Sequence, residues 1–495
     1  MNLAKSAIWV IISEIIFNLS SYVVHSVVGR ILGPADYGRF SLVVTLTTMV
    51  IILIGRGIPT AMTKYLSEIF EKNPEMVPSI KRQAAKMQFF LMGGIALLFF
   101  FSAPLIAWAL NDPTLTPLFQ LSSLIIPAFA LTSFYVQYFI GLHQFNVQSI
   151  LKTSRSLFRI IFVITLAYFF GVNGSVSGYI LAPLSVSFLA IIIDKFWIAK
   201  KYPAGWKTAF PAKKLLNYAW QIVIFFLAYE LLISIDLYLV KGILRSDHLT
   251  GIYNSALTIG RIPYYLFSAL TIMILPIISQ STAEGNQTKT SQIIGWSLRI
   301  MLILLAPIVI LMAYFSTPLI QFFYSSKYLE AARPMSILVY GVGFLTVFYV
   351  LSFIMNGAGK TKIPMIISII GVFLNALLNY ILIKKYALLG SAWAISITSL
   401  TVMLIMLFYL YREFKVTIVL KSFVKIFIAS AALFFACWIF PRGEFTFLIW
   451  SLLLFVLYLS VLYLLGEITP KDWDYVLALV KRKKSEEIKP TLENN

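Results

Sequence analysis

Apolar runs long enough to cross a membrane, separated by short charged or Pro- and Gly-containing segments, occupy most of this chain. A bilayer-spanning helix needs about 20 consecutive, mostly apolar residues. About fourteen runs meet that length, and they cover residues 7–28, 40–63, 87–109, 118–141, 150–170, 175–197, 216–240, 253–278, 291–315, 335–356, 364–383, 388–411, 423–440 and 445–465. Only 12% of the residues are charged, whereas a soluble domain carries about 25%. The sequence therefore predicts an all-α polytopic membrane protein and excludes a soluble enzyme, a disordered chain and a nucleic-acid-binding module.

The distribution of the 40 lysine and arginine residues predicts the orientation of the chain. With the N-terminus in the cytoplasm, about 28 of them lie in cytoplasmic segments and about 9 in outside loops, which follows the positive-inside rule. We therefore expect a multi-pass protein of the cell membrane with both termini in the cytoplasm. The first run contains Glu14 and His25 and lacks a small-residue cleavage site, so it is interpreted as an uncleaved helix. The basic tail is expected to contact anionic membrane lipids and not nucleic acid.

Two sequence landmarks recur at nearly the same spacing and indicate an internal duplication. Gly38 and Gly251 each follow an Ile-Leu pair and a polar turn with an Asp, and they are 213 residues apart. Gly141 and Gly357 each end the fourth predicted helix of their half, and they are 216 residues apart. An even number of helices gives both halves the same orientation, and transporters with such parallel halves bind their ligand between them. We predict two six-helix lobes in parallel orientation and two C-terminal helices, with boundaries at 1–200, 214–411 and 423–466, followed by a basic cytoplasmic tail at 467–495.

Three short segments carry a resemblance to a known family. They are GRILGPADYGRFSL after the first predicted helix, ID-x-YLV-x-GIL with TGIYNSAL in the second half, and the turn NGAGKTKIP. These segments, with the helix count and the duplication, resemble the Wzx-type polysaccharide-biosynthesis flippases of the multidrug/oligosaccharidyl-lipid/polysaccharide exporter superfamily. The resemblance implies that a polyprenyl-pyrophosphate-linked oligosaccharide is flipped from the cytoplasmic to the outer leaflet. It also implies that the polyprenyl tail stays in lipid near the last two predicted helices.

Several arginines fall within or at the ends of predicted spans. An ionisable side chain inside a membrane is costly and is by default a functional candidate. From the direction of each helix, we expect Arg155 and Arg159 near the cytoplasmic entrance, Arg56 in the inner half and Arg261 in the outer half of the membrane. Guanidinium groups stay charged and bind phosphate in bidentate geometry. This ladder of cations would suit the pyrophosphate headgroup that the resemblance implies, whereas Arg299 is interpreted as a snorkelling residue.

Other polar residues lie on the same predicted helix faces. Asn18 and His25 are expected to contact the substrate, and Tyr265 offers an aromatic face for sugar stacking. Three carboxylates complete the candidate site, namely Glu14, Glu230 and Asp236. They could pair with the arginines, bind a coupling H⁺ or Na⁺, or hydrogen-bond to sugar. The sequence leaves these roles open, since burial raises and a neighbouring arginine lowers a carboxyl pKa.

No motif for a cofactor, a metal or an enzymatic reaction is found in the sequence. The single cysteine, Cys437, cannot form an intramolecular disulfide, and the three histidines lie too far apart to predict a metal site. The Gly359-Lys360-Thr361 run resembles the end of a phosphate-binding loop, but Ile354 occupies the position of its first glycine. We expect a monomeric transporter that is not an enzyme. The alternatives are a multidrug/cation antiporter of the same superfamily, in which the carboxylates would carry the function, a lipid II flippase, and a membrane glycosyltransferase.

Overall fold

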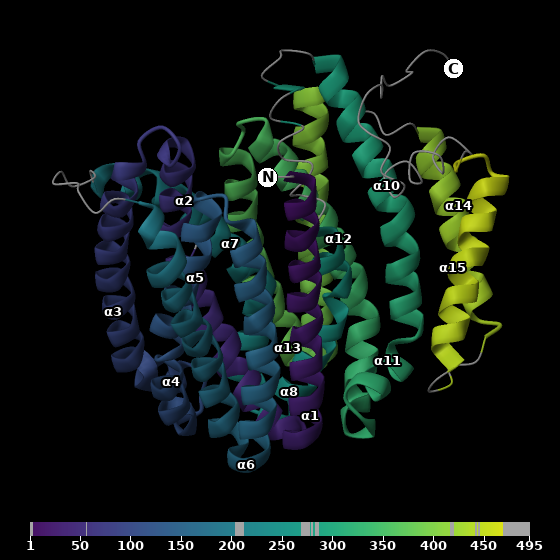
Figure 1. The fold of residues 1–495 in the computed structure, drawn as a ribbon. Coiled ribbons are helices and arrows are strands. Elements are labelled where there is room, and N and C mark those ends of the chain that lie inside the picture. The colour runs from purple at the N-terminus through teal and green to yellow at the C-terminus, as the bar shows by residue number, and fades with distance from the viewer. Residues whose placement is uncertain are drawn as a thin grey trace.

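The computed structural model describes residues 3–55, 57–202, 212–268, 278, 281–282, 287–415, 420–440, 443 and 446–468. Every regular element within these ranges is a helix, and the longer helices run side by side in one bundle (Figure 1). Eight helical segments of this part of the chain are long and apolar enough to cross a membrane. The predicted all-α polytopic class is therefore confirmed. Some of these segments contain two predicted runs each, so the total of about fourteen spans stays a prediction.

The helices of the first half are α1 (Leu3–Gly55), α2 (Ile58–Ile69), α3 (Val77–Ala109), α4 (Thr116–Ser122), α5 (Ile125–Gly141) and α6 (Phe145–Ile193). Those of the remaining chain are α7 (Ala212–Leu244), α8 (Asp247–Gly260), α10 (Gln287–Tyr314), α11 (Ser316–Phe323), α12 (Ala332–Gly357), α13 (Lys362–Phe414), α14 (Leu420–Cys437) and α15 (Thr446–Leu464). Short 3₁₀ or π turns link some of them, at Pro74–Met76, Pro113–Leu115, Asp194–Ile198, Ala199–Lys201 and Ser326–Ala331.

Local chemistry explains where several of these helices begin, break and reverse. α8 begins after Ser246, whose Oγ accepts a hydrogen bond from the Leu249 N–H at 3.2 Å. α6 is interrupted at Gly171, where φ is 58°, a conformation that glycine adopts readily. Beyond this break the chain reverses and packs closely on itself. The close packing is evident at Gly174, where an added Cβ would lie only 1.9 Å from the Leu166 carbonyl oxygen.

Several residues with positive φ in the first half have a counterpart in the second half at an almost constant offset. A helix as long as α6 or α13 would exceed the hydrocarbon core of about 30 Å, so each must turn back at such a break. Similar breaks and turns occur in both halves, 212 to 216 residues apart, and the pairs are Gly33 with Arg245, Asn111 with Ser325, His143 with Gly359, and Gly171 with Ala387. This spacing agrees with the predicted duplication, whose lobe boundaries stay a prediction.

The two halves meet along α1 and α8, near the middle of the bundle in Figure 1. Gly38 and Gly251, the two sequence landmarks, face each other at this contact. An added Cβ at Gly38 would lie 2.1 Å from the Asp247 carbonyl oxygen, and one at Gly251 would lie 1.9 Å from the Pro34 carbonyl oxygen. Only residues without a side chain allow the two backbones to approach so closely.

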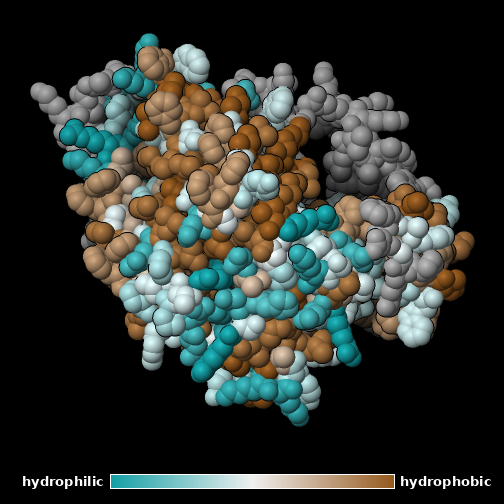
Figure 2. Space-filling view, turned by 90° about the horizontal axis from the view of Figure 1, so that it is seen from below, coloured by the Kyte–Doolittle hydropathy of each residue, from teal (hydrophilic) through white to brown (hydrophobic). Residues whose placement is uncertain are grey.

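This contact lies toward the end of the bundle opposite the N-terminal end of α1, which we call the lower end because it is lowest in Figure 1. The charge pattern predicts that the lower end faces outside. Seen from below, hydrophilic side chains gather across this end beside extended hydrophobic surfaces (Figure 2). The helices α14 and α15 stand at the edge of the bundle and pack on α10 through apolar side chains such as Ile303, Leu433 and Phe447. Arg299, interpreted above as a snorkelling residue, pairs with Glu467 at 2.7 Å.

Candidate functional site

Three of the predicted arginines lie where the two halves meet. Arg155 and Arg159 stand one turn apart on α6, and Arg261 directly follows α8. Tyr265 lies within electrostatic reach of both Arg159 and Arg261, so it links the cations of the two halves. The Tyr22 ring packs edge-on against Tyr265, with 6.3 Å between the ring centroids. The fourth predicted arginine, Arg56, lies outside the described residues.

Arg155 and Arg159 form what we call the central cation pair. Arg159 is only 7% exposed, donates to the Phe17 carbonyl oxygen at 2.8 Å and to the Ser20 hydroxyl, and stacks over the Phe17 ring at 4.5 Å. The Arg155 guanidinium lies 4.0 Å from the centroid of the Phe129 ring. Among the described residues, neither guanidinium has a carboxylate within 4.0 Å. Two like charges one helical turn apart repel each other, so an anion placed between them would relieve this repulsion.

The side chain of Arg159 reaches across to α1. Its guanidinium bonds to Phe17 and Ser20, which lie near the middle of the part of α1 before the Gly33 break. The expected position was the cytoplasmic entrance, at the end of the predicted helix. A long side chain and the tilt of its helix both move a charged group away from the level of its Cα, and sequence spacing contains neither quantity. Arg159 and Arg261 both lie within electrostatic reach of Tyr265, and the ladder stays a prediction.

Arg261 lies at the C-terminal end of α8 and has acidic neighbours. The predicted run 253–278 is interrupted here, because Pro263 has no N–H to continue the hydrogen bonds of α8. Arg261 therefore sits at the negative end of the α8 dipole, which favours a cation, and its Nη2 donates to the Ile233 carbonyl oxygen. Asp236 and Glu230 of α7 both lie within electrostatic reach of it.

Asp236 is fully buried, and its two carboxylate oxygens are occupied. Oδ2 accepts from the Tyr253 hydroxyl at 2.9 Å, and Oδ1 accepts from the Leu237 N–H at 2.9 Å. A further chain of buried polar groups lies beyond Tyr253. Ser391 donates to Asn379 at 2.7 Å, Asn379 donates to the Asn375 side chain at 2.8 Å, and Asn375 donates to the Leu232 carbonyl oxygen at 3.1 Å.

Sequence reasoning missed Asn375, Asn379 and Ser391. The signal that could have found them was present, since two asparagines one helical turn apart interrupt the otherwise apolar run 364–383. Polar groups inside a membrane span are commonly functional or join helices. Here they join α7 to both parts of α13.

Two predicted residues have partners other than the arginines. Glu14 forms an ion pair with Lys152 of α6, and Lys152 is not one of the predicted arginines. His25 Nδ1 lies 3.0 Å from the hydroxyl of Tyr37. Asn18 is half-buried on α1, next to Phe17. The predicted polar face of the first helix is therefore divided between several neighbours.

The Tyr37 hydroxyl joins the two halves below the arginines. In addition to His25, it lies 2.8 Å from the Tyr324 hydroxyl and accepts from Asn254 Nδ2 at 2.9 Å. Tyr37 belongs to α1, Asn254 to α8, and Tyr324 follows α11. Three hydrogen bonds at one hydroxyl therefore hold this part of the interface together.

Closest to the lower end, a cluster of charged residues completes the contact, and we call it the lower-end cluster (Lys241, Asp112, Asp247 and Arg39). Lys241 is 2% exposed and donates to Asp112 at 2.6 Å and to Asp247, while Arg39 lies 3.9 Å from Asp247. Burial raises the pKa of Asp112, but hydrogen bonds from Lys241 and Thr114 and the charge of Lys241 outweigh it, and the pKa is lowered. These contacts join α1, α7, α8 and the turn that contains Asp112 at the lower end.

The arrangement suits a ligand that combines an anionic group with a polar or ring-shaped group. The guanidinium groups of Arg155 and Arg159 face aromatic rings, and Arg261 lies within electrostatic reach of Tyr265. Such a site can bind phosphate by charge and sugar by stacking. Within the described residues, no group of three or more His, Cys, Asp or Glu side chains could hold a metal ion.

Comparisons with known proteins agree with the fold. A family model described as polysaccharide biosynthesis protein matches residues 3–282, and a model described as MatE matches residues 222–381. The lipid II flippase MurJ of Bacillus subtilis is 25% identical over 402 residues, which make up 72% of this chain and 71% of that protein. A putative O-antigen transporter of Shigella flexneri is 20% identical over 419 residues, or 80% of this chain and 95% of that protein. A solved structure of a lipid II flippase MurJ in an inward closed conformation covers 92% of this chain and 98% of its own, with a TM-score of 0.74 and 19% identity.

Proposed function

Because the chain belongs to the polysaccharide biosynthesis protein family of the multidrug/oligosaccharidyl-lipid/polysaccharide exporter superfamily, we propose that it flips a polyprenyl-pyrophosphate-linked oligosaccharide across the cell membrane. The proposal rests above all on the central cation pair, in which Arg159 is buried and Arg155 is half-buried. Neither guanidinium group has a carboxylate partner in the described part of the chain. The similarity to a putative O-antigen transporter supports a glycan cargo. The similarity to a lipid II flippase supports a lipid carrier.

In the proposed mechanism, the two lobes rock about the interface in alternating access. Residues 1–200 and 214–411 form the lobes, and both termini lie in the cytoplasm. With the lower end closed, the headgroup enters from the cytoplasm. Its pyrophosphate binds Arg155, Arg159 and Arg261, and Arg56 adds a further cation. Asn18, His25 and Tyr265 contact the glycan, while the polyprenyl tail stays in lipid near α14 and α15.

Among the carboxylates, we assign ion coupling to Asp236. Because Asp236 is buried, its negative charge is costly unless a proton or a cation compensates it. Asp236 also lies within electrostatic reach of Arg261, so binding of the proton or cation would change the electrostatic environment of the anion site. Glu14 is assigned a pairing role because it already has Lys152. Replacing Asp236 with Asn should abolish acceleration by an H⁺ or Na⁺ gradient in vesicles while leaving gradient-independent flipping measurable. Acceleration that is retained in this variant would exclude Asp236, and omitting each gradient in turn identifies the ion.

The decisive experiment is glycan export by Arg159→Ala and Arg261→Ala in a strain that lacks this protein. We expect surface glycan to fall at least tenfold, which corresponds to about 1.4 kcal/mol of lost interaction, while the amount of protein in the membrane stays unchanged. Arg333→Ala is the matched control, because Arg333 is exposed and lies outside the site. Normal export in both site variants would reject the proposal.

Two other cargoes have specific support. The MurJ relative favours lipid II, and the MatE match over residues 222–381 favours a cationic drug. Purified protein in vesicles should therefore be offered lipid II, a longer lipid-linked oligosaccharide and a cationic dye. Our proposal predicts that only the lipid-linked substrates move, with the longer glycan preferred. Dye transport that depends on Asp236 and not on Arg159 would favour the antiporter.

A further inference from the structure

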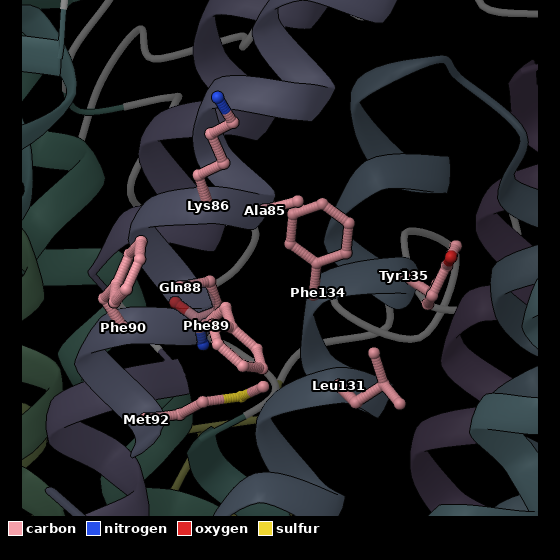
Figure 3. Close-up of a pocket in the computed structure, with 9 residues that line it drawn as sticks. All are labelled: Ala85, Lys86, Gln88, Phe89, Phe90, Met92, Leu131, Phe134 and Tyr135. Atoms are coloured by element: carbon pink, nitrogen blue, oxygen red, sulfur yellow. The ribbon is translucent and has the colours of Figure 1, made fainter. Parts of the chain in front are cut away.

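A crevice of about 610 Å³ opens on the outer face of the first half, between α3 and α5. Figure 3 shows Lys86, Gln88 and Phe89 on one wall and Leu131, Phe134 and Tyr135 on the other. It is separate from the arginine site, which lies between the halves. Because α3 belongs to a predicted membrane span, this crevice faces the bilayer, and its natural occupants are lipids.

Gln88 is the unusual feature of this crevice. It is 2% exposed, and neither its Oε1 nor its Nε2 has a hydrogen-bond partner in the described structure. Its neighbours in Figure 3 are mostly apolar, including Phe89, Leu131 and Phe134. A buried amide without partners is strongly disfavoured, and hydrocarbon cannot supply them. A ligand that satisfies Gln88 must therefore bring both an acceptor and a donor into an apolar crevice.

The rim of the crevice carries positive charge. Lys86 is exposed, lines the crevice, and has no carboxylate within 4.0 Å among the described residues. Arg82 lies one helical turn before it and is exposed as well. Lys81 is already paired with Asp194. The charge pattern places this end of α3 near the cytoplasmic leaflet, where anionic headgroups attract lysine and arginine.

We propose that this crevice binds an anionic glycerophospholipid of the cytoplasmic leaflet, of the phosphatidylglycerol class. The lipid phosphate lies against Lys86, and an ester carbonyl accepts from Gln88 Nε2. A headgroup hydroxyl donates to Gln88 Oε1. One acyl chain packs between Phe89, Leu131 and Phe134. The site is independent of the proposed flipping function, because it uses neither the arginines nor the interface between the halves.

The test is lipid retention by the purified full-length protein, measured by native mass spectrometry during titration with phosphatidylglycerol and, separately, phosphatidylcholine. Wild type should retain phosphatidylglycerol at least tenfold better than phosphatidylcholine. Gln88→Leu and Lys86→Ala should each lower that preference several-fold. The matched control for the amide, Gln83→Leu, lies on the same helix outside the crevice and should retain the preference.

A second measurement separates a lipid site from a merely strained side chain. In lipid-free detergent, Gln88→Leu should raise the unfolding temperature, because it removes an amide without partners. Added phosphatidylglycerol should then stabilise wild type and leave the variant unchanged. Leu131→Trp, which fills the crevice without changing Gln88 or Lys86, should also abolish lipid stabilisation. Equal lipid stabilisation of wild type and Gln88→Leu, or retention of a polyprenyl phosphate in place of phosphatidylglycerol, would overturn the proposal.

Discussion

Two groups of cations lie near the interface between the halves, and they differ in their partners. The central cation pair, Arg155 and Arg159, contacts aromatic faces, a carbonyl oxygen and a hydroxyl. Lys241, in the lower-end cluster, lies between two carboxylates. Their common location shows that burial at this interface does not by itself determine how a charge is neutralised.

The difference indicates two roles for buried charge in the molecule. Lys241 is neutralised within the protein, and removing it would leave two carboxylates close together, so its effect is structural. The central cation pair has no such compensation in the described residues, and a bound anion would supply it. We therefore expect substitutions at the centre to alter transport and substitutions at the lower end to alter which conformation is populated.

The largest effect on export is expected from giving the central pair a carboxylate. Ser20 accepts a hydrogen bond from Arg159, so Ser20→Asp would place a negative charge beside that guanidinium and compete with the substrate. Export should fall at least tenfold, or about 1.4 kcal/mol, while the unfolding temperature stays the same or rises. Ser20→Asn is the neutral control of nearly equal size and should export more than Ser20→Asp. Equal export by the two variants would show that the charge of Arg159 is not available to an anion.

The next effect concerns the glycine contact that brings the lower end together. Gly251→Ala would place a Cβ against the Pro34 carbonyl oxygen, a backbone atom that cannot rotate away. We expect this overlap to disfavour the closed lower end by about 3 kcal/mol. Spin labels at Asp36 and Lys327 should then report a longer distance. Gly93→Ala and Gly94→Ala are the controls, since no atom lies within 4 Å of a Cβ added at either position.

Neutralising Lys241 should have a somewhat smaller effect. Lys241→Met keeps an apolar stem but leaves Asp112 and Asp247 without their shared cation, while Arg39 still lies near Asp247. We expect a loss of about 2 kcal/mol in unfolding free energy, together with wider spin-label distances at the lower end. The triple variant with Asp112→Asn and Asp247→Asn should recover part of this loss. An unchanged export rate at normal protein level would agree with a structural role, whereas a lost preference for anionic substrate would place Lys241 in the binding site.

The sequence predicted the parts of this molecule that depend on local pattern. Apolar runs gave the helical class, and Gly38 and Gly251, recognised only as repeat landmarks, prove to be the residues that touch between the halves. An ionisable group inside a span is a functional candidate, which points to both Asp236 and Arg261, and these two residues lie within electrostatic reach of each other.

Partners and depth were harder to predict, because they depend on helix tilt and on side-chain reach. Lys152 as the partner of Glu14 and Tyr37 as the partner of His25 both lie across helix contacts that a single sequence does not specify. The level of Arg159 follows from its long side chain reaching α1. The crevice beside Gln88 was missed for the same reason, since neither residue spacing nor composition reports a space between two helices.

The smallest predicted effect is a loosening of the lower end in acid. The pKa of Asp112 in the folded protein lies below its ordinary value of 3.8, because Lys241 and Thr114 favour the ionised form over the effect of burial. Its contribution to stability is therefore fully present above that ordinary value and is lost as the pH falls through the lower, folded pKa. Spin-label distances at the lower end should lengthen below about pH 4, and Asp112→Asn should reduce this dependence without abolishing it, since Asp247 also faces Lys241. The central pair has no carboxylate partner in the described residues, so it should not contribute to this acid dependence. The spin-label distances of Arg159→Ala and wild type should therefore change equally with pH, and a difference between them would show that the two regions are coupled.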